Sequence, residues 1–316
     1  MSILDADIAV LVPCFNEEAT IAEVVRDFKK ALPGCTVFVY DNASTDATSE
    51  VARQAGAVVR FEPIPGKGNV VRRMLADVEA DVYIMVDGDG TYDATRAPEL
   101  VQKLLAESLD MVNAGRVETN VLAYRRGHRF GNWLLTTLVA KLFGNRLTDM
   151  LSGYRILSRR FVKSFPALSA GFEVETELTV HALLLRVPVA EVPTDYRERP
   201  MGSESKLRTI RDGIRIMRTI GMLVKEERPL EFFSAVCILF MVGSSALGVP
   251  VVLEFLATGL VPRLPTAVLA VGLMILGFLS LMSGLILQTV TRGRIELKRM
   301  HYLNVPIRFT KRRSLP

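Results

Sequence analysis

The sequence is poor in cysteine and shows no disulfide framework. Its 316 residues include three cysteines, Cys14, Cys35 and Cys237, which are far apart in the chain. So few thiols are typical of a protein that works in a reducing compartment. No secretory signal peptide precedes the first predicted strand. We therefore expect the amino-terminal part of the chain to be cytoplasmic.

Long apolar runs are missing from the first part of the chain and present in the last. Up to about Glu227 the pattern is that of a water-soluble α/β domain, and two uncharged runs follow at residues 232–253 and 264–291. Each exceeds the roughly 20 residues that cross a hydrocarbon core of ~30 Å. A buried core helix could explain one such run. Two in succession, joined by a short connector, predict a transmembrane hairpin.

Positive charges gather at the open end of this predicted hairpin, with Arg263 alone near its tip. The basic residues at the open end are Lys225, Arg228, Arg292, Arg294, Lys298 and Arg299. Basic residues favour the cytoplasmic side of a membrane. We therefore expect a multi-pass protein of the inner cell membrane with both termini in the cytoplasm.

Residues 82–86 form an apolar run that leads directly into Asp87 and Asp89. Such a run is typical of a buried parallel strand, and ligands bind at the carboxyl ends of these strands in open α/β sheets. Two carboxylates there can hold a hard cation, Mg²⁺ or Mn²⁺, together with phosphate oxygens. A solvated Asp/Gly turn is the simpler alternative. An EF-hand calcium loop is excluded, because the twelfth position from Asp87 holds Pro98.

Strand and helix patterns alternate before this pair of aspartates. Strands are predicted at residues 8–13, 36–40 and 57–61, and helices at residues 20–32, up to about 55 and at 66–79. This spacing predicts right-handed crossovers and a mostly parallel, Rossmann-like sheet. Ser44 or Thr45 is expected to cap the second helix.

Polar residues follow the predicted strands at the edge where a nucleotide would lie. Asn16 and Glu17 come after the first strand, and Asp41 ends the second. Lys67 lies in a Gly-Lys-Gly-Asn loop that opens a helix. The loop is not a Walker motif, because Phe61 occupies the first glycine position. It is expected to place a positive charge near a diphosphate, or simply to start the helix.

Four polar segments form a combination that is more specific than any one of them. They are Val12-Pro13-Cys14-Phe15-Asn16-Glu17-Glu18, Asp41-Asn42-Ala43-Ser44-Thr45-Asp46, Gly66-Lys67-Gly68-Asn69 and Asp87-Gly88-Asp89. This combination resembles the inverting family 2 glycosyltransferases. Residues 148–155 narrow the resemblance to the branch of dolichyl-phosphate mannose synthase and bacterial polyprenyl-phosphate glycosyltransferases. It covers nearly the whole chain and implies a GT-A-type domain followed by a two-helix membrane tail.

The resemblance implies roles for the matched residues. The nucleotide-binding set is Pro13, Asn16, Glu17, Asp41, Lys67 and Asp87. Asp87 and Asp89 would hold the metal ion and the donor diphosphate, and are the first catalytic candidates. Mannose synthases typically have glutamine two residues after the second aspartate as a further ligand. Thr91 stands there in this chain, so neither a third ligand nor a GDP-mannose donor is implied.

Residues 148–155 add candidates on the acceptor side. Asp149 is the third catalytic candidate, expected to orient the acceptor loop or an arginine rather than to act as a base. Ser152, Arg129 and Arg146 are candidates for binding the acceptor phosphate, which guanidinium groups grip by paired hydrogen bonds.

Two basic amphipathic stretches are expected to lie at the membrane surface. The first contains Trp133 among leucines, and the second, residues 205–224, has an apolar stripe beside an arginine stripe. Such helices suit anionic bilayers, although a buried helix with a solvated basic start would also explain the first. Arg199 and Lys206 match a mobile loop of the family and are expected to close over the diphosphate. A plain basic linker explains them equally well.

Together these features predict transfer of a sugar from a nucleotide sugar, UDP- or GDP-linked, to undecaprenyl or dolichyl phosphate. A phosphate monoester has a second pKa of about 6, so the acceptor is largely anionic at pH 7 and needs no dedicated base. The metal ion and the basic residues would neutralise the leaving diphosphate. A single displacement would invert the anomeric centre. The product would serve the synthesis of cell-envelope glycans.

Other functions fit less well. A processive polysaccharide synthase carries Gln-x-x-Arg-Trp, whereas the single tryptophan, Trp133, follows Phe-Gly-Asn. A non-catalytic, membrane-anchored nucleotide binder would not need both aspartates. Nucleic-acid binding is disfavoured, because the basic residues lie beside apolar stripes. The expected partners are the nucleotide sugar, the polyprenyl phosphate and the bilayer, and a homo-oligomer stays open.

The predicted organisation of the chain follows from these patterns. Residues 1–204 form the cytoplasmic glycosyltransferase domain, residues 205–228 an amphipathic juxtamembrane helix, residues 229–292 two transmembrane helices and residues 293–316 a basic cytoplasmic tail.

Overall fold

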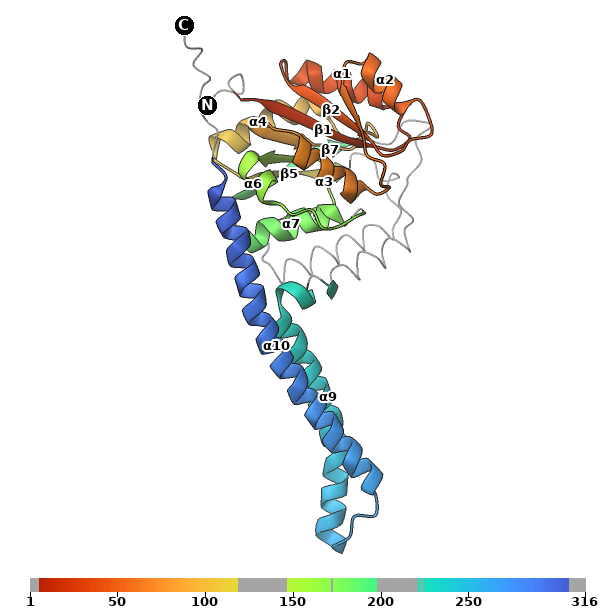
Figure 1. Cartoon of the computed structure of the whole chain (residues 1–316), viewed down its shortest axis with the longest axis vertical. Helices are drawn as coiled ribbons and strands as arrows, with labels where there is room; N and C mark the ends of the chain where they lie inside the picture. Colours follow the sequence, from red (N-terminus) through yellow and green to blue (C-terminus); the bar gives the residue numbers. More distant parts are fainter. Residues whose placement is uncertain (1–5, 119–146, 172, 198–220, 223, 307–316) are drawn as a thin grey trace. The chain divides into compact units, whose positions relative to one another are not determined.

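The structure, a computed structural model shown in Figure 1, describes residues 6–118, 147–171, 173–197, 221–222 and 224–306. It divides into two compact units. The first consists of Met1–Ile216 with Lys298–Pro316, and the second of Met217–Leu297.

A seven-stranded sheet forms the centre of the first unit. Its strands are β1 (Ile8–Cys14), β2 (Thr36–Asp41), β3 (Val58–Phe61), β4 (Val82–Met85), β5 (Met111–Glu118), β6 (Arg155–Ser158) and β7 (Val189–Tyr196). Their order is β3-β2-β1-β4-β6-β5-β7. All neighbouring strands are parallel except that β6 runs antiparallel to β4 and β5. The prediction of a mostly parallel sheet is confirmed.

Helices cover both faces of this sheet. They are α1 (Ile21–Ala31), α2 (Thr48–Gln54), α3 (Lys67–Asp77), α4 (Ala97–Ala106), α6 (Arg159–Ser164) and α7 (Val174–Leu185), with the short 3-10 helix η2 (Ala94–Arg96) before α4. The apolar cores place α1 and α4 on one face and α3, α6 and α7 on the other (Figure 1). The two cores fix the sheet from both sides, so that its carboxyl edge can carry polar loops.

The start of α2 differs from the sequence prediction. The helix begins at Thr48, and its N-cap residue is Ala47, which makes no side-chain cap bond. The amide of Thr48 instead donates to Asp46 at 3.0 Å. Ser44 does not cap the helix, because its hydroxyl oxygen accepts from the backbone amide of Asn16 at 2.9 Å. The predicted cap by Ser44 or Thr45 is therefore wrong. These two residues instead bond the loop after β2 to Asn16 in the loop after β1.

Two long apolar helices make up most of the second unit. They are α9 (Pro229–Thr258) and α10 (Leu264–Asn304), and both are long and apolar enough to cross a membrane, with a mean hydropathy of 2.3 in their most apolar windows. Small residues let them approach closely: the Ser244 hydroxyl donates to the Ala270 carbonyl at 2.7 Å. Gly259, with φ of 69°, ends α9. The predicted pair of apolar helices is present, and α10 continues to Asn304.

Candidate active site

The two aspartates after β4 lie in different settings. Asp89 is buried, and its Oδ1 accepts from the hydroxyl of Thr91 at 2.6 Å and from the amide of Thr91 at 3.2 Å. Thr91 is itself fully buried. The residue that stands in place of the family's glutamine therefore orients Asp89. Asp87, in contrast, pairs with a positively charged side chain.

That cation is Lys67, which lies between two carboxylates. Its Nζ is 2.5 Å from Asp87 Oδ1 and 2.5 Å from Glu175 Oε1. Burial alone would lower the pKa of Lys67, but the two carboxylates outweigh it and raise that pKa well above its ordinary value. Glu175 belongs to the first turn of α7 and is buried. Sequence reasoning missed Glu175; the one available signal was a glutamate between the apolar positions Val174 and Leu178.

The Gly-Lys-Gly loop is held by close backbone packing. The amide of Gly68 donates to the Ala170 carbonyl at 3.1 Å, and a Cβ on Gly68 would collide with the Ser169 carbonyl. Gly66 has φ of 126°, a conformation that side chains other than glycine rarely adopt. The two glycines thus bring the start of α3 against the segment before α7, which places Lys67 beside Glu175.

The predicted nucleoside residues lie together at the carboxyl ends of β1 and β2. Pro13 is the residue before the end of β1, and Asp41 ends β2, which pairs with β1. Asp41 is buried, and its carboxylate accepts from the Ser49 hydroxyl at 2.6 Å. Asn16, with φ of 52°, accepts from the Thr45 amide at 2.8 Å. The amide of Glu17 donates to Thr48 Oγ1 at 2.8 Å.

The segment 148–155 approaches Asp87 from the other half of the sheet. A Cβ on Gly153 would collide with the Asp87 carboxylate, so a side chain there would displace that carboxylate. The amide of Gly153 donates to the Tyr92 hydroxyl at 2.8 Å. The chain thereby brings Asp87, Lys67, Glu175 and residues 148–155 into one site, although they are far apart in sequence.

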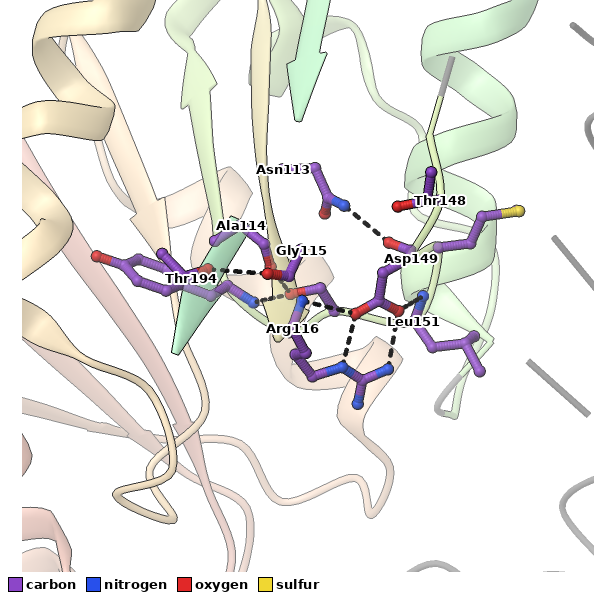
Figure 2. Close-up of polar contacts among 12 residues, drawn as sticks. Asn113, Ala114, Gly115, Arg116, Thr148, Asp149, Leu151 and Thr194 are labelled. Carbon is purple, nitrogen blue, oxygen red and sulfur yellow. Dashed lines mark hydrogen bonds and ion pairs between the residues drawn. The ribbon is translucent and has the colours of Figure 1, made fainter. Parts of the chain in front are cut away.

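Asp149 lies in this segment and binds an arginine, as Figure 2 shows. Its Oδ2 accepts from Arg116 Nε at 2.7 Å and its Oδ1 from Arg116 Nη2 at 2.8 Å, and the amides of Arg116 and Leu151 also donate to it. Burial alone would raise the pKa of Asp149, but the hydrogen bonds and the charge of Arg116 hold it below its usual value. Asp149 is thus an anion engaged with Arg116, which agrees with an orienting role rather than that of a base. Arg116 is a site residue that sequence reasoning missed.

A second carboxylate, Glu191 on β7, fixes the backbone of the same segment. It accepts from the amide of Thr148 at 2.6 Å, from the Thr148 hydroxyl at 2.7 Å and from the amide of Asp149 at 3.0 Å. Asn113 on β5 donates to the Asp149 carbonyl at 2.7 Å (Figure 2). It also donates to Glu191 at 2.8 Å. The segment is held from β5 and β7 at once.

Ser152 faces into the protein in this arrangement. It is fully buried, and its hydroxyl donates to the Ala114 carbonyl at 2.6 Å. The geometry therefore gives Ser152 the task of holding the segment to β5. Arg155 is also fully buried and donates to the carbonyls of Met150 and Ser152.

Four predicted site residues, together with Trp133, lie outside the described part of the chain. They are Arg129, Arg146, Arg199 and Lys206. Their assigned contacts with the acceptor phosphate and the donor diphosphate stay predictions.

The residues present fit a divalent cation that shares its coordination with a diphosphate. The described residues include no group of three or more His, Cys, Asp or Glu side chains arranged for a metal ion. Asp87 and Asp89, separated by Gly88 at the end of β4, offer two hard carboxylate ligands. A cation held by one or two carboxylates completes its shell with substrate phosphates and water. The two carboxylates thus match a cation that shares its coordination shell with the phosphates of the substrate.

The protein has a mixed sheet with acidic residues at its carboxyl edge. This is the arrangement of GT-A-type domains, which bind nucleotide sugars. The model of the family described as Glycosyl transferase family 2 matches residues 9–165, and the chain belongs to this family of glycosyltransferases.

Several curated proteins are similar to this chain in sequence. Protein RfbJ of Shigella flexneri is 53% identical over 124 residues, which are 39% of this chain and 96% of that protein. Glycosyltransferase AglJ of Haloferax volcanii is 36% identical, covering 72% of this chain and 76% of its own length. A dolichyl-phosphate hexose transferase of the same organism is 28% identical, covering 70% and 96%.

Solved structures share the fold. Glucosyl-3-phosphoglycerate synthase from Mycobacterium tuberculosis, in complex with Mn²⁺, UDP and glucosyl-3-phosphoglycerate, is similar with a TM-score of 0.57. The sequences are 25% identical, and the match covers 70% of this chain and 80% of the other. A GT-A neighbour thus holds a divalent cation together with a nucleoside diphosphate.

Proposed function

We propose that the protein transfers a sugar from a UDP- or GDP-linked donor to a polyprenyl phosphate at the cytoplasmic face of the membrane. The observation that carries the proposal is the cluster of Asp87, Asp89 and Lys67 at the carboxyl edge of the sheet, in a chain with two helices apolar enough to span a bilayer. The name of the dolichyl-phosphate hexose transferase, a relative, supports a lipid phosphate as acceptor.

The acceptor phosphate supplies its own nucleophile. One of its anionic oxygens attacks the anomeric carbon, the bond from that carbon to the diphosphate breaks, and the nucleoside diphosphate leaves with the electron pair. This single step inverts the configuration at the anomeric carbon. A Mg²⁺ or Mn²⁺ ion on Asp87 and Asp89 would supply positive charge to the leaving diphosphate.

The residues of the chain position the reactants around this step. Asp149 holds Arg116 by two side-chain hydrogen bonds, so its carboxylate is committed to the arginine rather than to proton transfer. Arg129 and Arg146 are assigned to the acceptor phosphate, and Arg199 and Lys206 to the donor diphosphate. Preorganised charges of this kind stabilise the transition state without reorganisation.

Membranes that contain the protein test the proposal directly. They are incubated with a panel of labelled nucleotide sugars and either polyprenyl phosphate or unphosphorylated polyprenol, and the lipid is extracted. We expect labelled lipid with one donor, only with the phosphate and only with a divalent cation. Nucleotide binding without any labelled lipid across the panel would instead support the alternative function, a non-catalytic nucleotide-sugar-binding protein.

A further inference from the structure

We infer that Glu175 is a positioning residue of the donor site, which shares the Lys67 ammonium with Asp87. This leaves Asp87 available to a divalent cation and keeps Lys67 directed at the donor diphosphate. The inference rests on the proposed function, because it concerns how the same site receives its donor.

The contacts of Glu175 are unusual for a buried carboxylate. Of the described residues, only Lys67 donates to its side chain, at 2.5 Å from Oε1. The second oxygen, Oε2, is buried and has no hydrogen-bond partner among them. A buried carboxylate that accepts no amide hydrogen bond depends strongly on nearby cations, and the buried guanidinium of Arg155 also acts on Glu175 through its charge. Glu175 therefore competes effectively with Asp87 for Lys67.

This competition is important because a metal ion and Lys67 would both bind the Asp87 carboxylate. Lys67 Nζ contacts Asp87 Oδ1, an oxygen that a bound divalent cation would also take. If Asp87 were the only partner of Lys67, the ammonium would neutralise Asp87 and oppose a second cation there. With Glu175 on its other side, the charge of Lys67 is shared between two carboxylates. Asp87 is then neutralised less, which favours binding of a metal ion there.

The backbone keeps this arrangement in place. Lys67 starts α3 and Glu175 lies in the first turn of α7. The two starts are joined by the Gly68 amide, which donates to the Ala170 carbonyl at 3.1 Å. When Asp87 turns to a cation, Lys67 is still held by Glu175, and the N–H that Asp87 releases can donate to the diphosphate.

Three variants of the full-length protein in detergent test the inference through binding rather than turnover. Mn²⁺ affinity is measured without nucleotide, by the paramagnetic resonance signal of the free ion. UDP and GDP affinities are measured by calorimetry with Mn²⁺ present. We expect Glu175→Gln to weaken Mn²⁺ binding about tenfold, the size of a charge-assisted contact. Glu175→Asp, which keeps the charge, should recover part of this loss.

Lys67→Met should change the two affinities in opposite directions. Without the ammonium, Asp87 is open to the ion, so Mn²⁺ binds more tightly, while the nucleoside diphosphate binds about tenfold more weakly. A residue that only supports the fold would weaken both. As a matched control, Glu177→Gln removes a charge from the same helix, where Glu177 accepts from the amides of Leu168 and Ser169, and should leave Mn²⁺ affinity within about twofold.

Two outcomes are decisive. If the unchanged protein binds UDP or GDP while Glu175→Gln and Lys67→Met leave Mn²⁺ affinity as it was, the inference is overturned and the proposed function stands. If the unchanged protein binds neither nucleotide nor Mn²⁺, both are overturned together. Should Glu175→Gln fail to fold, Glu175→Asp decides instead: a partial loss of Mn²⁺ affinity is expected, and an unchanged affinity overturns the inference.

Discussion

At the scale of single residues, the site depends on carboxylates whose neighbours differ. Asp89 is oriented by Thr91 through two hydrogen bonds, whereas Asp87 meets Lys67. In the contacts described, Asp89 accepts from a neutral hydroxyl and an amide, whereas Asp87 shares its charge with an ammonium group. The two positions of the Asp-x-Asp pair are therefore not equivalent.

The first prediction concerns Asp89. Asp89→Asn keeps the shape and the acceptor oxygen for Thr91 but loses the negative charge, so transfer should fall at least about 100-fold, as for lost electrostatic stabilisation in other active sites. The melting temperature should change little. Extracted lipid-linked sugar measures the first, and thermal unfolding the second. Asp93→Asn is the matched control, since Asp93 caps η2, and it should keep its activity; near-normal turnover by the Asp89 variant would contradict the role.

The second prediction concerns Arg129 and Arg146. Either arginine changed to alanine should raise the KM for polyprenyl phosphate about 10- to 150-fold, the range for a charge-assisted contact of about 1.5–3 kcal/mol. Nucleotide affinity, measured by calorimetry in detergent, should stay nearly unchanged. Arg186→Ala removes an exposed arginine at the end of α7 and serves as control. Weaker nucleotide binding with an unchanged lipid KM would move that arginine to the donor site.

At the scale of elements, the loop before β6 is clamped between two strands. Arg116 on β5 holds the side chain of Asp149, and Glu191 on β7 holds the backbone amides of residues 148 and 149. β5 and β7 are themselves paired in parallel over eight residue pairs, so both anchors move as one body. The clamp thus holds residues 148 and 149 to the sheet through both their backbone and the Asp149 side chain.

The third prediction is the pH dependence of this clamp. The pKa of Asp149 is lowered in the folded state, so its contribution to stability is present above the ordinary pKa of an aspartate and is lost as pH falls through the lowered value. Asp149→Asn should therefore lower the free energy of unfolding by about 2 kcal/mol at pH 7. The difference from the unchanged protein should shrink toward pH 3.

Thermal unfolding of the first unit within the whole protein, followed at pH values from 7 to 3, measures this difference. Glu99→Gln is the control, since Glu99 forms an exposed ion pair with Arg96, and exposed pairs contribute little. A difference for Asp149→Asn that stays constant with pH would show that the Arg116 contact does not perturb the carboxyl.

At the scale of the whole molecule, two long apolar helices accompany a domain with a polar, acidic edge. Each helix exceeds the length needed to cross a bilayer, and basic residues flank the open end of the pair. A water-soluble donor and a lipid-borne acceptor need such a combination, because the acceptor's chain stays in the bilayer while its phosphate meets the sugar.

The fourth prediction concerns membrane topology. In a variant without the three native cysteines, a cysteine introduced at Gly259 should react with an impermeant reagent added from outside, and one introduced at Ser314 should not. The physical reason is that the cations at the open end favour the cytoplasmic side. Gly259 ends α9 at the turn between the two helices. Labelling of both positions, or the reverse pattern, would refute a hairpin with cytoplasmic ends.

The sequence alone determined the strands up to β4, the crossover helices, the two apolar helices and the family, because period, length and clustered polar motifs are local properties of a chain. It also identified Asp87, Asp89 and Lys67. Tertiary structure decided the long-range partners. Glu175 pairs with Lys67, and Arg116 and Glu191 bind Asp149, each across a long stretch of chain. No periodicity relates residues that meet only when strands β4, β6, β5 and β7 pair in that order. The inward direction of Ser152 was decided in the same way, since its hydroxyl binds the Ala114 carbonyl that the fold places within reach.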